Sequence, residues 1–391
     1  MSAGKSHQGA INNENLVDSR TSGENGRRIL QRDPNPHLFR PITFRSVTVR
    51  NRIMLSPMCQ YSAEQGLAND WHFVHLGARA AGGAGIVSTE AVHVEPRGRI
   101  TPHCLGLWND NQRDKLQRIA AFIAQQGAIP AIQLGHAGRK ASVGRPWEGT
   151  RPIPKSAGGW EVISASDRPY ANGWPVPTPM SHEEIKEAMK IFSNAVCRAR
   201  QAGFKILELH GAHGYLIHQF LSPLSNFRND GYGGSFENRI RFLLESIDAA
   251  RREWPDELPL FLRLSVTDWV EGGWDVGDSI QLASLLKQRG DVDLIDCSSG
   301  GNDPRQQIPI YPGYQVPFAQ KIRETAGMST AAIGLIQSPD LAESIIANGQ
   351  ADLVVLGRAL LADPVWPLRA ANKLKAKNVT WPVQYERSNI F

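Results

Sequence analysis

Short apolar runs alternate with longer amphipathic stretches from residue 51 to the end of the chain. The runs are almost continuously apolar, which is typical of parallel strands that are buried on both faces. They are Ile53–Met58, Gly85–Ala91, Ile129–Leu134, Lys205–His210, Leu260–Ser265, Val292–Cys297, Thr330–Gly334 and Asp352–Gly357. Helical periodicity between them is clearest at Ile185–Ala202 (with Ser181 as N-cap), Phe236–Glu253, Ile280–Gln288 and Pro339–Asn348.

Repeated strand-then-helix units predict an α/β protein built as a closed (β/α)8 TIM barrel. A doubly wound sheet is the competing architecture. No GxGxxG motif follows the first strand, however, and eight regular repeats favour closure. A length of 391 residues suits one such barrel with insertions.

Three segments fall outside the regular repeats. Residues 1–36 are polar and lack apolar periodicity, so we expect a disordered extension before a barrel that spans 37–391. Residues 141–180 are rich in Pro, Gly and Trp and follow the third strand, where a long connection emerges at the catalytic face. We expect this insertion to cap the barrel, and residues 364–391 to form a C-terminal tail.

Composition narrows the classes of partner. The net charge of +5 comes from scattered rather than clustered basic residues, which favours anionic small molecules over nucleic acid. No run approaches about 18 apolar residues, so no membrane span is expected. Four well-separated cysteines without a CxxC pair argue against a zinc site, an iron–sulfur cluster and a disulfide framework. We therefore expect a cytoplasmic protein.

The ends of the last two strands predict a phosphate site. Loops after strands 7 and 8 of such barrels commonly bind phosphate, and here they contain Gly334 and the pair Gly357-Arg358. Glycine lets backbone N–H groups approach an anion, and a guanidinium adds charged donors.

The end of the fourth strand holds His210 and His213, followed by Tyr215. The two histidines could bind a metal, but the nearest carboxylate, Glu208, is expected to point to the other side of the strand. They could also be structural. A third interpretation is a pair of N–H donors for a substrate oxygen, with the tyrosine as proton source. Spacing alone does not separate these alternatives.

Several motifs resemble one known family. Leu38–Pro41 with Val47–Pro57 is similar to the first strand of the Old Yellow Enzyme family of FMN-dependent ene-reductases. Gln133–Arg139 resembles its third-strand motif, and Asn226–Phe242 resembles its most specific signature. The resemblance covers the chain from Leu38 onward.

Further residues resemble the thermophilic-like branch of that family. These are Cys59 with Tyr61, the pair His210 and His213, and the closing Tyr385–Arg387. The resemblance implies that Arg387 reaches the active site of a neighbouring subunit in a homodimer or homotetramer. The chain continues past this arginine with four more residues, where short-tailed relatives tend to stop.

The resemblance also implies a cofactor site and a reaction. NADPH reduces FMN, and the reduced flavin then reduces the C=C bond of an activated alkene. His210 and His213 hold the activating oxygen, Tyr215 protonates the α-carbon, and Tyr61 orients the substrate. The implied FMN contacts are Pro57, Met58, Cys59, Ala91, Gln133, His210, Arg263, Gly334, Gly357 and Arg358.

Other classes of function remain to be weighed. A flavin-dependent isomerase of the same scaffold would typically lack the tyrosine acid, which is present here. A metal-dependent barrel lyase or hydrolase would use the histidine pair as ligands, although we expect no metal. A binding barrel without catalysis would not need so many ligand-ready strand ends.

Overall fold

The computed structural model describes residues 35–377 and 379–388. Eight parallel strands close into a barrel in the order β10-β11-β12-β3-β4-β5-β8-β9. They are β3 (Ile53–Leu55), β4 (Ile86–His93), β5 (Ile129–Gly135), β8 (Ile206–Gly211), β9 (Leu260–Ser265), β10 (Leu294–Ser298), β11 (Thr330–Ala332) and β12 (Leu353–Leu356). Each overlaps the apolar run predicted for it, so the predicted barrel is confirmed.

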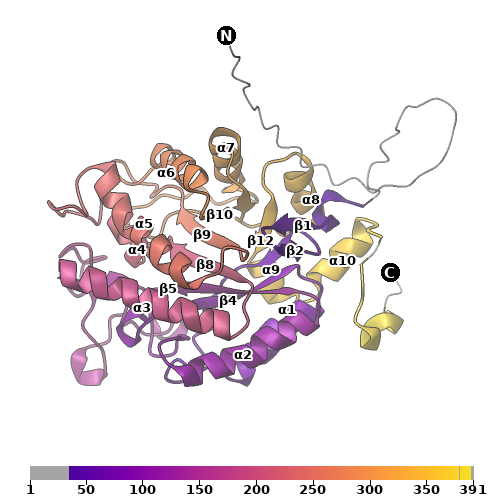
Figure 1. The fold of residues 1–391 in the computed structure, drawn as a ribbon, viewed down its shortest axis with the longest axis horizontal. Coiled ribbons are helices and arrows are strands. Elements are labelled where there is room, and N and C mark those ends of the chain that lie inside the picture. The colour runs from indigo at the N-terminus through magenta and orange to yellow at the C-terminus, as the bar shows by residue number, and fades with distance from the viewer. Residues whose placement is uncertain (1–34, 378, 389–391) are drawn as a thin grey trace, which may run out of the picture.

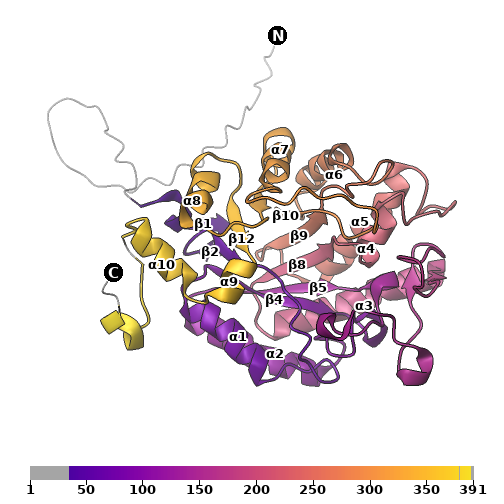
Figure 2. The same ribbon diagram turned by 180° about the vertical axis from the view of Figure 1, so that it is seen from behind.

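Helices surround the strands on the outside, as Figures 1 and 2 show. The crossover helices are α1 (Asp70–Ala81), α2 (Asp110–Gln125), α3 (His182–Gln201), α5 (Phe236–Glu253), α6 (Val276–Arg289), α7 (Val316–Ala326) and α8 (Pro339–Ala347). A short α4 (Leu216–Leu221) precedes α5, and α9 (Arg358–Ala362) and α10 (Trp366–Lys373) follow the last strand.

Capping side chains set where these helices begin. The predicted N-cap Ser181 accepts a hydrogen bond of 3.1 Å from the backbone N–H of Glu184. Helix α6 begins at Val276, earlier than the predicted Ile280, because Asp275 accepts a 3.0 Å hydrogen bond from the N–H of Asp278. The apolar periodicity alone did not show this polar first turn.

A hairpin closes the end of the barrel at which the strands begin. An antiparallel hairpin of β1 (Ile42–Phe44) and β2 (Val47–Val49) packs there, and the Phe44 ring lies 5.1 Å from the ring of Phe261. The predicted first strand, Ile53–Met58, is therefore preceded by a hairpin that the sequence did not predict. The chain turns between β2 and β3, where Arg50 donates hydrogen bonds to carbonyl oxygens of the α1–β4 region.

The 141–180 insertion has little regular structure and a small core of its own. It contains 3-10 turns at Pro146–Glu148 and Lys155–Ala157 and a two-stranded parallel pair, β6 (Ile163–Ser164) and β7 (Thr178–Pro179). Its buried residues Val143 and Val162 belong to an apolar cluster against which Cys59, Tyr61 and Tyr215 pack. The insertion thus packs against residues from the carboxyl end of the barrel.

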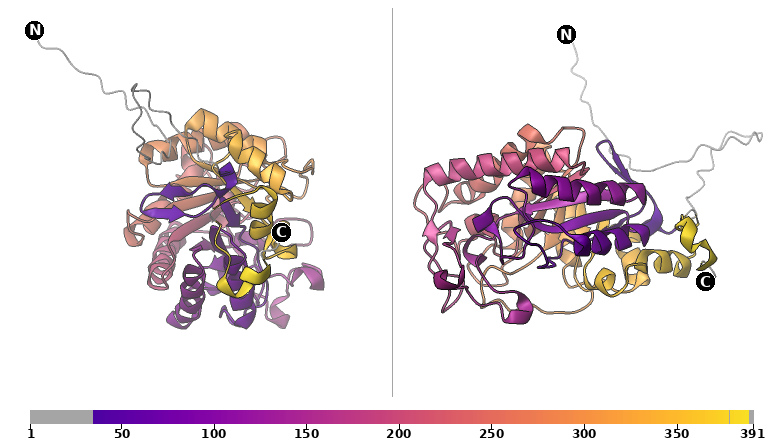
Figure 3. Two further views of the ribbon diagram at one scale, coloured as in Figure 1. Left: turned by 90° about the vertical axis from the view of Figure 1, so that its right-hand side faces the viewer. Right: turned by 90° about the horizontal axis from the view of Figure 1, so that it is seen from below.

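The C-terminal segment lies elsewhere. After α10, a 3-10 helix at Val383–Ser388 is exposed at the end of the molecule opposite the insertion (Figures 1 and 3). The predicted extension 1–36 lies, except for Asn35 and Pro36, outside the described residues. Among the described residues, no helix is both long and apolar enough to cross a membrane.

Candidate active site

The predicted histidine–tyrosine group gathers at the carboxyl end of β8. The ring centroid of His210 lies 5.1 Å from that of His213 and 5.0 Å from that of Tyr215, each pair nearly perpendicular. The chain makes this cluster by a sharp turn, in which His213 takes a left-handed conformation with φ of 60°. Three side chains that are close in sequence therefore face one another.

Hydrogen bonds and burial fix the protonation of the two histidines. Nδ1 of His210 accepts a 3.3 Å hydrogen bond from the N–H of Ala212, which leaves the proton on Nε2. Nε2 of His213 shares a 2.7 Å hydrogen bond with the hydroxyl of Ser298. Burial, followed by the charge of Arg263, lowers the pKa of both imidazoles well below the usual value. Both rings are neutral at pH 7, and the Nε2–H of His210 is left to donate.

Tyr215 keeps its proton over the same pH range. Burial raises the pKa of its phenol well above 10, and the nearby Cys59 and Tyr61 raise it further. A phenol that does not ionise remains available as a proton donor. The site therefore combines a protonated acid with neutral hydrogen-bond donors.

Lys140 was not predicted from the sequence, although it lies beside Tyr215. Its Nζ is 5.2 Å from the centre of the Tyr215 ring and donates hydrogen bonds to the backbone oxygens of His213 and Gly301. Burial, followed by the charge of Arg139, lowers the pKa of this amine to about 7. The available signal was its position, directly after the third-strand motif.

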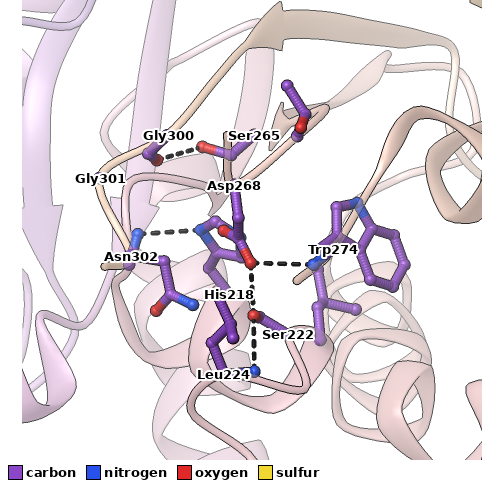
Figure 4. A network of polar contacts seen from close by, with 12 residues as sticks. His218, Ser222, Leu224, Ser265, Asp268, Trp274, Gly300, Gly301 and Asn302 are labelled. Atoms are coloured by element: carbon purple, nitrogen blue, oxygen red, sulfur yellow. Dashed lines mark hydrogen bonds and ion pairs between the residues drawn. The ribbon is translucent and has the colours of Figure 1, made fainter. Parts of the chain in front are cut away.

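Two glycines allow the loops around the histidines to meet closely. A Cβ on Gly214, whose φ is 71°, would lie 2.4 Å from the carbonyl oxygen of Gly301. The hydroxyl of Ser265 connects the same loops, because it accepts a hydrogen bond from the N–H of His213. It also donates one to the carbonyl oxygen of Gly300 (Figure 4). The loop after β8 is thus held by the loop after β10.

Cys59 and Tyr61 lie in the loop that follows β3, beside the insertion. Tyr61 has a left-handed φ of 51°, and its ring makes an edge contact with Trp147 of the insertion, at 6.0 Å between centroids. Burial raises the pKa of the Cys59 thiol well above its usual value. The cysteine is therefore a neutral thiol at pH 7 and not a nucleophilic thiolate.

A cluster of polar side chains fills the barrel beneath the histidines. The amide of Gln133 donates a 2.7 Å hydrogen bond to Glu208, and Arg263 donates one of 3.2 Å to the hydroxyl of Ser56. Burial, followed by the charge of Asp296, raises the pKa of Glu208 to about 8. A second oxygen of Glu208 has no hydrogen-bond partner among the described residues.

The expected orientation of Glu208 is wrong. It faces the barrel interior with Gln133, because residues two apart on a strand share a face and Glu208 lies two residues before His210. It nevertheless does not complete a metal site with the pair. Within 35–377 and 379–388, no group of three His, Cys, Asp or Glu side chains could hold a metal ion.

The loops after β11 and β12 enclose a cavity of about 140 Å³. A water molecule occupies roughly 30 Å³ of liquid, so the cavity has room for a larger group. Gly334, Gly357 and Arg358 line it, as the strand-end argument predicted, together with Tyr314 and Ser298. Because Ser298 also binds His213, this cavity adjoins the histidine pair. The residues present therefore fit a phosphate-bearing cofactor, whose phosphate Arg358 and the two glycines would hold.

A basic cavity at the ends of β11 and β12, beside neutral donors at the barrel mouth, defines a barrel enzyme that binds a phosphate-bearing cofactor. Comparison with known proteins identifies the family. The model of the NADH:flavin oxidoreductase / NADH oxidase family matches residues 37–377, and the chain belongs to this family. The resemblance to Old Yellow Enzymes is thereby confirmed.

Relatives agree with this assignment. The chain is 47% identical over 352 residues to the NADPH dehydrogenase of Geobacillus sp. (strain WCH70) and 46% identical over 352 residues to that of Bacillus subtilis (strain 168). Each alignment covers 90% of this chain and 98% of the relative. A structure of morphinone reductase in complex with tetrahydroNAD matches with a TM-score of 0.72 and 25% identity, covering 88% of this chain and 92% of that one. The protein is an NADPH-dependent FMN oxidoreductase.

The structure brings most of the predicted site residues to one end of the barrel. Pro57, Met58 and Cys59 follow β3, and a Cβ on Gly357 would contact the sulfur of Met58 at 3.5 Å. Ala91, Gln133 and Arg263 lie on β4, β5 and β9, and Ala91 pairs with Gln133 across the first two of these strands. Arg387 is the exception, because it lies in the exposed C-terminal 3-10 helix.

Proposed function

We propose that this protein reduces the C=C bond of alkenes conjugated to a carbonyl or nitro group. The observation that supports it most directly is the contact of two neutral histidines, His210 and His213, with a protonated Tyr215. Neutral N–H donors suit an oxygen on which negative charge develops, and a phenol suits proton delivery to carbon.

In this proposal the histidine pair binds the activating oxygen. The Nε2–H of His210 is free to donate, because its Nδ1 is occupied by the Ala212 N–H. His213 contributes the nitrogen that Ser298 leaves unused. Donors that are already oriented stabilise the growing charge without reorganisation. Tyr215 then protonates the α-carbon, and the ring of Tyr61 borders the substrate.

The cofactor residues are proposed from the same geometry. When bound, FMN would supply the hydride-transfer chemistry that links NADPH to the β-carbon of the alkene. Arg358 and the backbone at Gly334 and Gly357 hold its phosphate, and Arg263 provides positive charge inside the barrel. The full proposed set is Pro57, Met58, Cys59, Ala91, Gln133, His210, Arg263, Gly334, Gly357 and Arg358.

We also propose that the enzyme acts as a homo-oligomer in which Arg387 contacts substrate in a neighbouring subunit. The exposed segment that contains Arg387 lies at the opposite end of the molecule from the insertion, which favours a role outside its own barrel. Truncation after Gln384 should raise the KM for the alkene several-fold without changing flavin content. Unchanged kinetics would restrict this arginine to the surface.

The test begins with the purified protein, which should be yellow and should oxidise one NADPH for each cyclohexenone reduced. NADPH-independent isomerisation would favour the isomerase, and colourless protein that rejects FMN would rule out the proposal. Tyr215→Phe should slow the alkene half-reaction far more than flavin reduction by NADPH, measured separately by stopped-flow absorbance. Equal slowing of both would remove Tyr215 from the role of acid. Loss of activity with a chelator would instead favour the metal-dependent alternative.

A further inference from the structure

A buried histidine–aspartate pair lies beneath the loop that contains His213 and Tyr215. Nε2 of His218, on α4, is 3.0 Å from Oδ1 of Asp268, which follows β9. Both side chains are fully buried, with 0% exposure. Burying such a pair costs free energy unless each group is well hydrogen-bonded, so its other contacts show what it stabilises.

The pair is connected to the active-site loop through one backbone group. Nδ1 of His218 accepts a 2.9 Å hydrogen bond from the N–H of Gly214, which lies between His213 and Tyr215. Because Nδ1 accepts, Nε2 bears the proton and donates to Asp268. A continuous series of hydrogen bonds therefore connects the backbone of Gly214, the imidazole of His218 and the carboxylate of Asp268.

Asp268 lies at the end of this series and is itself held by further hydrogen bonds. Its Oδ2 accepts a 2.9 Å hydrogen bond from the N–H of Trp274 and another from the hydroxyl of Ser222 (Figure 4). Burial alone would raise the pKa of Asp268, but its interaction with His218 and the hydrogen bonds from Ser222 and Trp274 more than offset this effect, and the pKa is lowered. The carboxylate thus stays ionised and keeps the imidazole in one orientation.

Gly214 cannot move far from this acceptor. Its carbonyl oxygen accepts a 2.7 Å hydrogen bond from the amide of Gln219, and a Cβ at this position would meet the oxygen of Gly301. Both polar backbone groups of Gly214 are therefore held by α4. Small changes in this residue would move the rings on either side of it.

The same arrangement occurs in the neighbouring loop after β5. Nδ1 of His136 accepts a 2.9 Å hydrogen bond from the N–H of Gly138, and its Nε2 lies 2.9 Å from Oε1 of Glu95. In both loops, a histidine accepts a hydrogen bond from a glycine N–H and is held in turn by a carboxylate. We call this arrangement a brace, and it fixes the backbone of both loops.

We propose that His218 and Asp268 are positioning residues that set the location of Tyr215 and His213 relative to the bound alkene. The inference rests on the proposed ene-reductase function. A displacement of about 1 Å at a reacting group can cost on the order of 100-fold in rate, so weakening the pair should slow alkene reduction and spare flavin reduction by NADPH.

Three variants test the proposal in the FMN-loaded enzyme. His218→Leu removes both links, whereas His218→Asn keeps an oxygen near the position of Nδ1 for the Gly214 N–H. Asp268→Asn keeps the shape of the anchor and removes its charge. We expect the alkene half-reaction to fall about 30-fold in H218L and about fivefold in H218N and D268N. Flavin reduction by NADPH should stay within twofold in all three.

Ser246→Ala is the matched control, because Ser246 is equally buried and donates only within α5 and toward Met189. It should lower the melting temperature and leave both half-reactions unchanged. Parallel loss of both half-reactions in the His218 variants, in proportion to stability, would overturn the proposal. So would an H218N enzyme as slow as H218L.

A readout without turnover separates this proposal from the proposed function. Amide hydrogen exchange of the peptide that contains Gly214 should be faster in H218L than in the wild type, while Ser246→Ala leaves it unchanged. Faster exchange with no alkene reduction in the wild type would refute the ene-reductase function and keep the brace. Unchanged exchange would refute the brace itself.

Discussion

The side-chain nitrogen of Lys140 donates a hydrogen bond of 2.9 Å to the backbone oxygen of His213. The same amine donates a second hydrogen bond of 2.7 Å to the backbone oxygen of Gly301. One side chain after β5 therefore joins the loops after β8 and β10. These loops come from separate thirds of the sequence. The hydrogen bonds from Lys140 hold them together at the mouth of the barrel.

Replacing this lysine should disturb alkene reduction. Lys140→Met keeps much of the apolar stem but leaves two backbone oxygens without their donor, which costs about 1–3 kcal/mol for each group that stays buried. We expect about a tenfold fall in kcat with cyclohexenone and a smaller change in flavin reduction. Lys190→Met, at an exposed lysine on α3 paired with Glu187, is the control and should behave as the wild type. Equal rates in the two variants would contradict the prediction.

Ser298 should tune substrate binding through His213. Its hydroxyl shares a 2.7 Å hydrogen bond with Nε2, and this bond decides which nitrogen of the ring is left for the substrate. Ser298→Ala removes the hydrogen bond that orients the His213 ring, which is worth about 1 kcal/mol. The KM for cyclohexenone should therefore rise about fivefold. Steady-state kinetics measure this. Ser284→Ala, whose hydroxyl donates only to a carbonyl within α6, should leave the KM unchanged.

Stability should depend on pH through Glu208. Its pKa is raised to about 8 in the folded protein, so the folded state holds a proton that the unfolded chain releases above its usual value of 4.5. The stability contributed by this proton is complete below about pH 4.5 and is lost as the pH rises to about 8. Glu208→Gln is neutral throughout and keeps an acceptor for Gln133.

Urea unfolding of the FMN-loaded wild type and the Glu208→Gln variant at pH 5 and pH 8 measures this effect. The variant should gain free energy of unfolding relative to the wild type as the pH increases. A difference that is constant, or larger at pH 5, would mean that the carboxyl is already ionised in the folded protein.

Arg358 should determine how tightly the cofactor is held. It lines the cavity at the ends of β11 and β12, where a phosphate would accept charge-assisted hydrogen bonds worth about 1.5–3 kcal/mol. We expect Arg358→Ala to raise the Kd for FMN at least tenfold, as measured by flavin fluorescence titration. Arg369→Ala, which removes an exposed charge on α10 that is paired with Asp363, serves as control. FMN binding that is equally tight in both variants would place the phosphate elsewhere.

Much of the fold follows from local pattern. Buried parallel strands must be apolar on both faces, so all eight runs were visible in the sequence, and helix α5 spans Phe236–Glu253 as predicted. The hairpin before β3 was not predicted, because each of its strands is only three residues long and shows too little periodicity to be recognised. Strand ends predicted Gly334, Gly357 and Arg358 at one cavity, since the carboxyl ends of parallel strands meet.

The sequence by itself determined the barrel, the place of Gly334, Gly357 and Arg358 at one cavity, and the presence of two histidines and a tyrosine at the end of β8. These follow from periodicity and chain order, which are properties of neighbouring residues. Only the tertiary structure decided that the histidines are neutral, that Glu208 faces inward, and that Lys140 and His218 hold the loop in place. Protonation and positioning depend on burial and on hydrogen-bond partners that are distant in sequence, and these exist only once the chain has folded.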